Sequence, residues 1–540
     1  MRRIVVVAIG VLLTGSIVGN AQQPDQPTPT FRAGTTLVDF NIVAVDRRGN
    51  PVTDLRRDEI TIVENDQSRD VAFFQFEGAA TASATGAVTN QRAPLPAGTF
   101  TNRIEYAPRP SRNLIAIVLD LINTSIQQQA ELQTHLLHNL KQLPPDAHVG
   151  LYVLSEQAVA IHDFTQDAES LRARLEKSST GLQTTLMNSS RDIQGMLKAA
   201  REDHAASLAG MAQAQARAEG DFNQQIMKTR RRLTLQALES VGHHLAGVPG
   251  RKSIIWVSHG FALTDAHGTY TEQVSEAGQQ LATDNVAVYP VEAGGVGGTS
   301  MGLDDQSFGS TKGQSMTVGN SKSGPAYGRL QGTNELMASI TGGRVTRNSN
   351  DLTAGLISAA EDLRGTYSLG FYAVGIPDNR WHRLSVKVSR PGVTVRHRQG
   401  YLASSTTPAA GWPQDRWNEL AYRPLVSTAV RIDARPTIEA AALKLAVDVA
   451  IDDLQLRQTN DGHTADVDIA LVEKTAQGPT NVRVQSAQVE VPTGATPAVV
   501  PLSSTFTLNP QTISVRLIVR DKASGRIGSL DIPLEQLPKQ

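Results

Sequence analysis

The feature that most constrains this chain is the run LIAIVLD, from Leu114 to Asp120. Six apolar residues in succession leave no face of a strand for water, so the run predicts a strand covered on both sides, as in a parallel sheet flanked by helices. The run stops at a single acid, and hydroxyl and amide side chains follow it. The sequence therefore predicts an α/β unit with a polar site at the end of a central strand.

Strand and helix patterns alternate over residues 112–364. The segments HVGLYVLS, SIIWVS and VAVYPVE are apolar enough for buried strands, and AVAIHDF follows the first of them after a tight connection, as an antiparallel edge strand would. Helical patterns cover Gln127–Leu143, Asp167–Lys177, Ile193–Leu245 and Thr271–Asp284. This order predicts a doubly wound, mostly parallel sheet with its ligand site at the carboxyl ends of the strands. Residues 294–330 contain few large apolar groups and are expected to be a flexible insertion.

The segments on either side of this unit, residues 35–78 and 366–403, alternate apolar with polar residues. Each predicts too few strands to close a core in water. Pairing them buries the apolar face of both, so we expect one sandwich into which residues 112–364 are inserted.

The rest of the chain divides by composition. Residues 79–111 are rich in Ala, Thr, Gly and Pro and predict a linker on the surface, and residues 404–427 predict a second connector. Short alternating strands recur over residues 428–540, the pattern of a C-terminal antiparallel sandwich that folds independently.

The N-terminus predicts export. Residues 1–21 begin with two arginines, continue with an apolar run and end with small residues, which is the pattern of a signal peptide cleaved after Ala21. The apolar run is shorter than the roughly 20 residues of a spanning helix. No other segment is apolar enough to span a bilayer, so the mature chain is expected in the periplasm, at the cell surface or outside the cell. With no cysteine, it has no disulfide.

Composition and motifs argue against two functional classes. Lys and Arg (51) balance Asp and Glu (52), so no basic surface for nucleic acid is expected. The one Gly-x-Ser-x-Gly pattern, residues 298–302, lies in the glycine-rich insertion with no helix pattern directly after it. Zinc-protease and phosphate-loop motifs are absent from the sequence, so we expect a protein that is not an enzyme.

Five segments carry a family resemblance: VDFNIVAVDRRGNPVTDLRRDEITIVEND, VLDLINTS, RLTLQALESVGHHLAGVPGRKSIIWVSHGF, DLTAGLISAAEDLRGTYSLGFYA and VTVRHRQGYLA. Between about residues 35 and 403 the chain resembles proteins with a von Willebrand factor A domain, and more narrowly the exported VWFA-related proteins of acidobacteria. The resemblance implies a domain that binds a protein partner through the carboxyl edge of its sheet. It also implies Mg²⁺ or Mn²⁺ at that edge, held by an Asp-x-Ser-x-Ser motif, a threonine and a second aspartate.

The first motif is altered in this chain. Asp120 is kept, Ile122 replaces the first serine, and Thr124 can still supply a hydroxyl. A shift of the loop would let Asn123 or Ser125 face the ion instead. The alternative is that Asp120 caps a following helix and binds no ion.

The other two ligand positions are weaker. Thr184 or Thr185 is the candidate in the second loop, and His259, preceded by Ser258, stands where the third loop would carry its aspartate. One carboxylate with an imidazole suits Mg²⁺ poorly. We therefore expect a degenerate metal site, no cofactor other than Mg²⁺ or Mn²⁺, and a protein partner that binds around Asp120 and His259. A metal-dependent adhesin or matrix-binding protein with an intact ion is the alternative.

Overall fold

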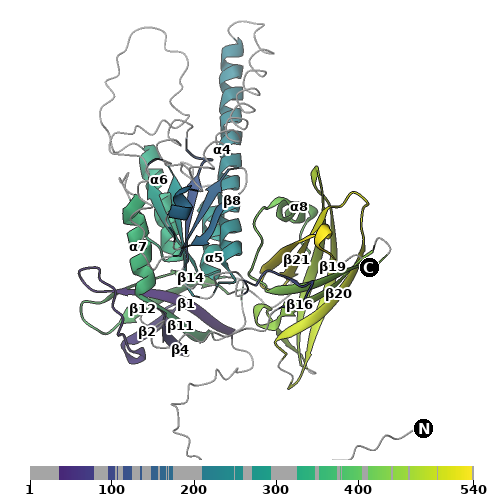
Figure 1. Cartoon of the computed structure of the whole chain (residues 1–540). Helices are drawn as coiled ribbons and strands as arrows, with labels where there is room; N and C mark the ends of the chain where they lie inside the picture. The colour runs from purple at the N-terminus through teal and green to yellow at the C-terminus, as the bar shows by residue number, and fades with distance from the viewer. Residues whose placement is uncertain are drawn as a thin grey trace, which may run out of the picture.

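The computed structural model of this chain describes residues 36–77, 95–103, 106, 114–124, 134, 136, 148–155, 158–165, 167, 169–173, 210–248, 250–258, 271–292, 325–346, 352–373, 378, 380–403, 411–439, 442–459, 462–494 and 497–537. The predicted signal peptide lies outside these residues. The described chain is a mixed α/β protein with one mixed sheet and several antiparallel sheets (Figure 1). Among the described helices, none is both long and apolar enough to cross a bilayer.

The N-terminal unit contains two four-stranded antiparallel sheets around one apolar core. The first sheet has the order β13 (Thr394–His397), β1 (Thr36–Val45), β11 (Thr366–Ala373) and β4 (Phe73–Phe76). The second has the order β14 (Gly400–Leu402), β12 (Trp381–Val388), β2 (Ile60–Glu64) and β3 (Gln67–Arg69). Strands from residues 36–76 and from 366–402 therefore lie side by side in both sheets, as the register of Phe40 opposite Leu369 illustrates.

The middle unit contains a five-stranded mixed sheet of order β10-β9-β6-β7-β8. β10 (Val286–Glu292), β9 (Lys252–Ser258), β6 (Leu114–Asp120) and β7 (His148–Leu154) are parallel, and β8 (Ala158–Thr165) runs antiparallel to β7. Every residue of β6 is buried, because β6 is the central strand and both of its faces contact apolar clusters.

Helices cover both faces of this sheet. On one face lie α4 (Gly210–Leu245), α5 (Thr271–Thr283) and α6 (Pro325–Thr341), and α7 (Leu352–Arg364) lies on the other. The predicted insertion, 294–330, is too long by six residues at its end, because Pro325 begins α6; proline suits the first turn of a helix, where no backbone N–H is required.

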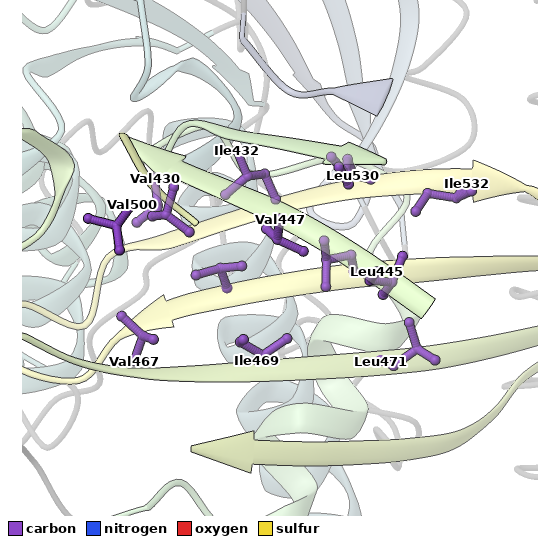
Figure 2. Packing of buried hydrophobic residues seen from close by; sticks show 14 of the residues in the cluster. Val430, Ile432, Leu445, Val447, Val467, Ile469, Leu471, Val500, Leu530 and Ile532 are labelled. Carbon is purple, nitrogen blue, oxygen red and sulfur yellow. The ribbon is translucent and has the colours of Figure 1, made fainter. Parts of the chain in front are cut away.

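The C-terminal unit is a sandwich of two antiparallel sheets. One has the order β20 (Val499–Thr507), β16 (Ala442–Ala450), β15 (Ile432–Glu439) and β5 (Phe100–Thr101). The other contains β17 (Arg457–Thr459), β18 (Gly462–Thr475), β21 (Ser514–Asp521) and β22 (Ile527–Pro533), with β19 (Gly478–Pro492) paired to β18. Figure 2 shows side chains such as Val447 and Ile469 meeting in the core between them.

The connector predicted for residues 404–427 contains a helix, α8 (Gln414–Tyr422), which the sequence reading missed. α8 packs on the outer face of the second sheet. Ile469 and Leu471 of β18 point into the sandwich, whereas Ala470 and Val472, which alternate with them along the strand, contact the buried Trp417 of α8 and its neighbours. β18 is thus apolar on both faces because each face is covered.

The predicted linker, 79–111, is also corrected in part. Residues 78–94 lie outside the described chain, but Phe100 and Thr101 form β5 and pair with β15. The side-chain amide of Asn102 fixes this segment: it donates to the carbonyls of Ser427 and Val430 at 2.9 Å and accepts from the backbone N–H of Ile432 at 2.8 Å. The C-terminal sandwich therefore includes a strand from before the middle unit and is not built from residues 428–540 alone.

Candidate functional site

The predicted site lies at the edge of the mixed sheet where β6 and β9 end. Asp120 is the last residue of β6 and is fully buried. The parallel register places Leu119 beside Val257, so Ser258, the last residue of β9, lies at the same edge and is also buried. A carboxylate in such a place requires compensation, because an isolated buried charge is strongly disfavoured.

The loop after β6 supplies part of that compensation. The backbone N–H of Asn123 donates to Oδ1 of Asp120 at 3.1 Å, and its side-chain Nδ2 donates to Oδ2 at 2.6 Å. The Thr124 hydroxyl donates to the Asp120 carbonyl at 2.5 Å. An N-cap carboxylate accepts a hydrogen bond from the N–H three residues later, as Asp120 does, but the helix that it would cap lies outside the described residues. This loop is held by its own short-range hydrogen bonds.

Two contacts tie the loop to the rest of the unit. The indole N–H of Trp256, in β9, donates to Oδ2 of Asp120 at 3.1 Å. Nδ2 of Asn123 also donates to the hydroxyl of Thr234 in α4 at 2.8 Å, and that hydroxyl donates to the carbonyl of Arg230 at 2.9 Å. The Asp120 edge is therefore connected to a neighbouring strand and to α4.

The charges at this edge are those of a buried acid near a partly buried base. Burial raises the pKa of Asp120 above its ordinary value, and the hydrogen bonds from Asn123 and Trp256 oppose part of that rise. Burial also lowers the pKa of Arg230, and the Asp120 carboxylate opposes that change. The guanidinium of Arg230 is thus the nearby opposite charge.

The described residues do not fit a Mg²⁺ or Mn²⁺ ion. Both oxygens of Asp120 accept hydrogen bonds from N–H groups, and the hydroxyl of Thr124 is directed at a backbone carbonyl. A hard divalent cation requires several free oxygens in near-octahedral geometry, and the positive charge of Arg230 opposes it further. The one unused oxygen is Oδ1 of Asn123, which is buried with no hydrogen-bond partner among the described residues. No group of three or more His, Asp or Glu with metal-binding geometry occurs in the described chain.

The structure thus brings together Asp120, Asn123 and Thr124, with Ser258 at the same edge. The other predicted positions, Ser125, Thr184 or Thr185, and His259, lie outside the described residues.

Three residues that the sequence reading missed belong to this site: Trp256, Thr234 and Arg230. For Trp256 a signal existed, since a buried indole usually finds an acceptor for its N–H. Trp256 lies two positions before the end of SIIWVS. An acceptor at the end of a neighbouring strand was therefore its natural partner. Nothing in the sequence marks Thr234 or Arg230, because their positions depend on how α4 packs.

Comparison with known proteins gives little further information. The chain matches no protein-family model. No curated protein matches it either. Among solved structures it is similar to an aerotolerance-related membrane protein from Bacteroides fragilis (14% identity, 46% of this chain, 98% of that chain, TM-score 0.26) and to the conserved hypothetical protein BatB from Bacteroides thetaiotaomicron (17%, 46%, 97%, 0.24). It is also similar to proximal thread matrix protein 1 from the mussel byssus (11%, 48%, 47%, 0.22). TM-scores this low carry no argument about the fold or the function.

Proposed function

We propose that this chain is an exported, non-enzymatic protein whose residues 112–364 form a von Willebrand factor A-type domain and bind a protein partner at the carboxyl edge of the mixed sheet. Four parallel strands with helices on both faces support this assignment of the domain. In an open α/β sheet, ligands bind beyond the carboxyl ends of the strands. The acid at the end of the central strand, Asp120, is the residue that such a domain directs toward its ligand.

The observation that carries the proposal is the set of N–H donors around Asp120. The N–H groups of Asn123 and Trp256 donate to the carboxylate where an ion would otherwise bind, so residues 120–124 are held by hydrogen bonds that need no metal. A surface that is already ordered loses less conformational entropy when a partner binds. The edge can therefore serve as a metal-independent protein-binding surface.

The alternative function is a Mg²⁺- or Mn²⁺-dependent adhesin or matrix-binding protein. One observation favours it: the orphan Oδ1 of Asn123 is a neutral, hard oxygen beside the Asp120 carboxylate. An ion here would have to displace the N–H donors of Asn123 and Trp256, and it would need further ligands from the loops at Thr184 and His259.

Cross-linking in the native cell envelope separates these functions. A photo-reactive benzoylphenylalanine replaces Ile122, which is half-buried in the loop after Asp120, and a matched control replaces Arg383, an exposed residue of the N-terminal unit. We expect a discrete cross-linked partner at position 122, none at 383, and no change when EDTA is added. Loss of the cross-link with EDTA and its return with Mg²⁺ would favour the adhesin. Equal cross-linking at both positions would refute binding at this edge.

A further inference from the structure

A second site lies away from Asp120, where the middle and C-terminal units meet. A cleft of about 430 Å³ is bounded by α4, α5 and the first turn of α8. Clefts of this size between domains commonly hold small ligands. Of its ten lining residues, nine carry a polar or charged group and Leu235 is apolar.

The charged side chains of the cleft are Lys228 and Arg232 of α4, Glu239 of α4, Glu276 of α5 and Arg416 of α8. Within the described chain, none of these five forms an ion pair, although Arg232 donates to Gln236 at 3.3 Å. Burial raises the pKa of Glu239, and the charges of Arg423 and Arg416 offset only part of that rise. Two carboxylates and three cations thus face one cleft, and the guanidinium of Arg416 also lies over the ring of Trp412, 5.3 Å from its centroid.

The opposite charges occupy different levels of α4. Lys228, Arg232, Leu235 and Glu239 are spaced by four, three and four residues, so they share one face of the helix. At a rise of 1.5 Å per residue, Glu239 lies about 10 Å along the axis from Arg232 and about 16 Å from Lys228. Gly242, three residues after Glu239, lies against Leu281 of α5, and the charges of Glu276 and Arg416 act on Glu239, so both residues lie toward its end of the cleft. One end therefore carries two cations, and the other carries two carboxylates and one arginine.

We propose that this cleft binds a short peptide with free ends, its carboxylate toward Lys228 and Arg232 and its ammonium group toward Glu239 and Glu276. An extended chain spans about 3.3–3.6 Å per residue, so three to five residues cover the distance of about 10–16 Å between the two ends. The side-chain amides of Gln225, Gln236 and Gln273 also line the cleft, and an amide both donates and accepts, as a peptide backbone requires. A simple anion would use only one end of this site.

The cleft and the Asp120 edge use different faces of α4. Arg230 and Thr234 face the Asp120 loop. Lys228 and Arg232 are each two residues from Arg230, which places them about 200° around the axis of α4 from that residue. The peptide site is therefore independent of the proposed function, and either can fail alone.

Isothermal titration calorimetry of the full mature chain tests the proposal with tetra-alanine as the probe. The free peptide is compared with its N-acetylated, its C-amidated and its doubly blocked form. We expect the free peptide to bind, each single block to weaken binding at least tenfold, and the doubly blocked form to give no heat. Absence of binding by free tetra-alanine, or equal binding of the blocked forms, would overturn the proposal without reference to any variant.

Variants then assign the two ends. The double variant Lys228→Gln/Arg232→Gln should bind the free peptide about as weakly as the wild type binds the C-amidated peptide. Amidation of the peptide should not weaken its binding to the double variant any further. The double variant Glu239→Gln/Glu276→Gln should remove the effect of N-acetylation in the same way. Arg383→Gln, an exposed arginine of the N-terminal unit, should leave the dissociation constant unchanged. If blocking an end weakens binding as much in the corresponding variant as in the wild type, the peptide does not lie in this cleft as we propose.

Discussion

Replacing Trp256 by phenylalanine tests whether hydrogen bonds, and not a metal ion, hold Asp120. Trp256 is only 2% exposed, and its indole N–H is the one donor to the carboxylate that comes from another strand. Phenylalanine keeps an aromatic ring in β9 but removes that donor. The side-chain amide of Asn123 still donates to Oδ2 of Asp120.

The expected cost has two parts. A hydrogen bond to a charged group contributes about 1.5–3 kcal/mol. The smaller ring adds ~1 kcal/mol for lost apolar contact and incomplete repacking. The sum is about 2.5–4 kcal/mol. Because each 1.4 kcal/mol changes an equilibrium constant tenfold, Trp256→Phe should raise the equilibrium constant for local opening roughly 60- to 700-fold.

Only the hydrogen-bond part should depend on pH. The folded-state pKa of Asp120 is raised, so as pH falls through that value the folded protein takes up a proton on Asp120. The neutral acid accepts a weaker hydrogen bond from the indole. The difference between wild type and Trp256→Phe should therefore be largest above the folded pKa and should shrink below it, whereas the packing part stays constant.

Hydrogen–deuterium exchange of peptides from β6 and β9 measures this difference, because amide protection reports the free energy of local opening. Comparing variants at the same pH removes the intrinsic pH dependence of exchange. Trp417→Phe is the matched control, since Trp417 is equally buried in the core under α8 and its indole has no hydrogen-bond partner in the described chain. A Trp256→Phe effect that is independent of pH, or no larger than that of the control, would refute the role assigned to the indole.

Other predictions address the fold, the buried charges, the metal and export. Gly343→Ala should lower the melting temperature strongly, because an added Cβ would lie 1.9 Å from a backbone oxygen of β10, whereas Gly332→Ala, with open space around it, should not. Burial raises the pKa of Asp284 to about 6, so this group's contribution to stability is lost as pH rises through that value; in Asp284→Asn, thermal melts should lack that loss. Mg²⁺ should change the melting temperature of the wild type no more than that of Asp120→Ala, and a rise seen only in the wild type would reveal a bound ion. N-terminal sequencing of the mature protein should begin at Gln22, and a chain that retains Met1 would contradict export by cleavage.

The backbone pattern of the middle unit was predictable because burial leaves a direct trace in sequence. A strand covered on both faces must be apolar throughout, and LIAIVLD at β6 and SIIWVS within β9 have that character. Asp120 was recognisable as a site residue because it interrupts such a run where the strand ends. The same logic identified alternating strands of the N-terminal unit such as β2, in which every second residue is buried.

Short or side-chain-dependent features were not predictable. β5 contains only Phe100 and Thr101, too few residues to show a period, and its place in the C-terminal sandwich depends on the amide of Asn102. α8 has a buried face of Trp417, Leu420 and Ala421, but nine residues offer little periodic signal. The charged cleft depends on bringing Glu239 and Arg416 together across two units, which no local pattern records.

The helix α4 is the element that these sites share. Its Thr234 accepts a hydrogen bond from the loop of Asp120, and its opposite face lines the cleft. Its last turn is fixed to the C-terminal unit: the backbone N–H of Thr428 donates to the carbonyl of His243 at 2.9 Å, and Nδ1 of His244 lies 2.8 Å from the carbonyl of Val426. A ligand in the cleft would therefore contact the same helix that holds the loop of Asp120. If peptide binding alters partner affinity at the Asp120 edge, linkage requires the partner to alter peptide affinity by the same factor. Calorimetry of the peptide with and without the partner would measure that factor directly, and equal affinities in both titrations would mean that α4 connects the two sites structurally but not energetically.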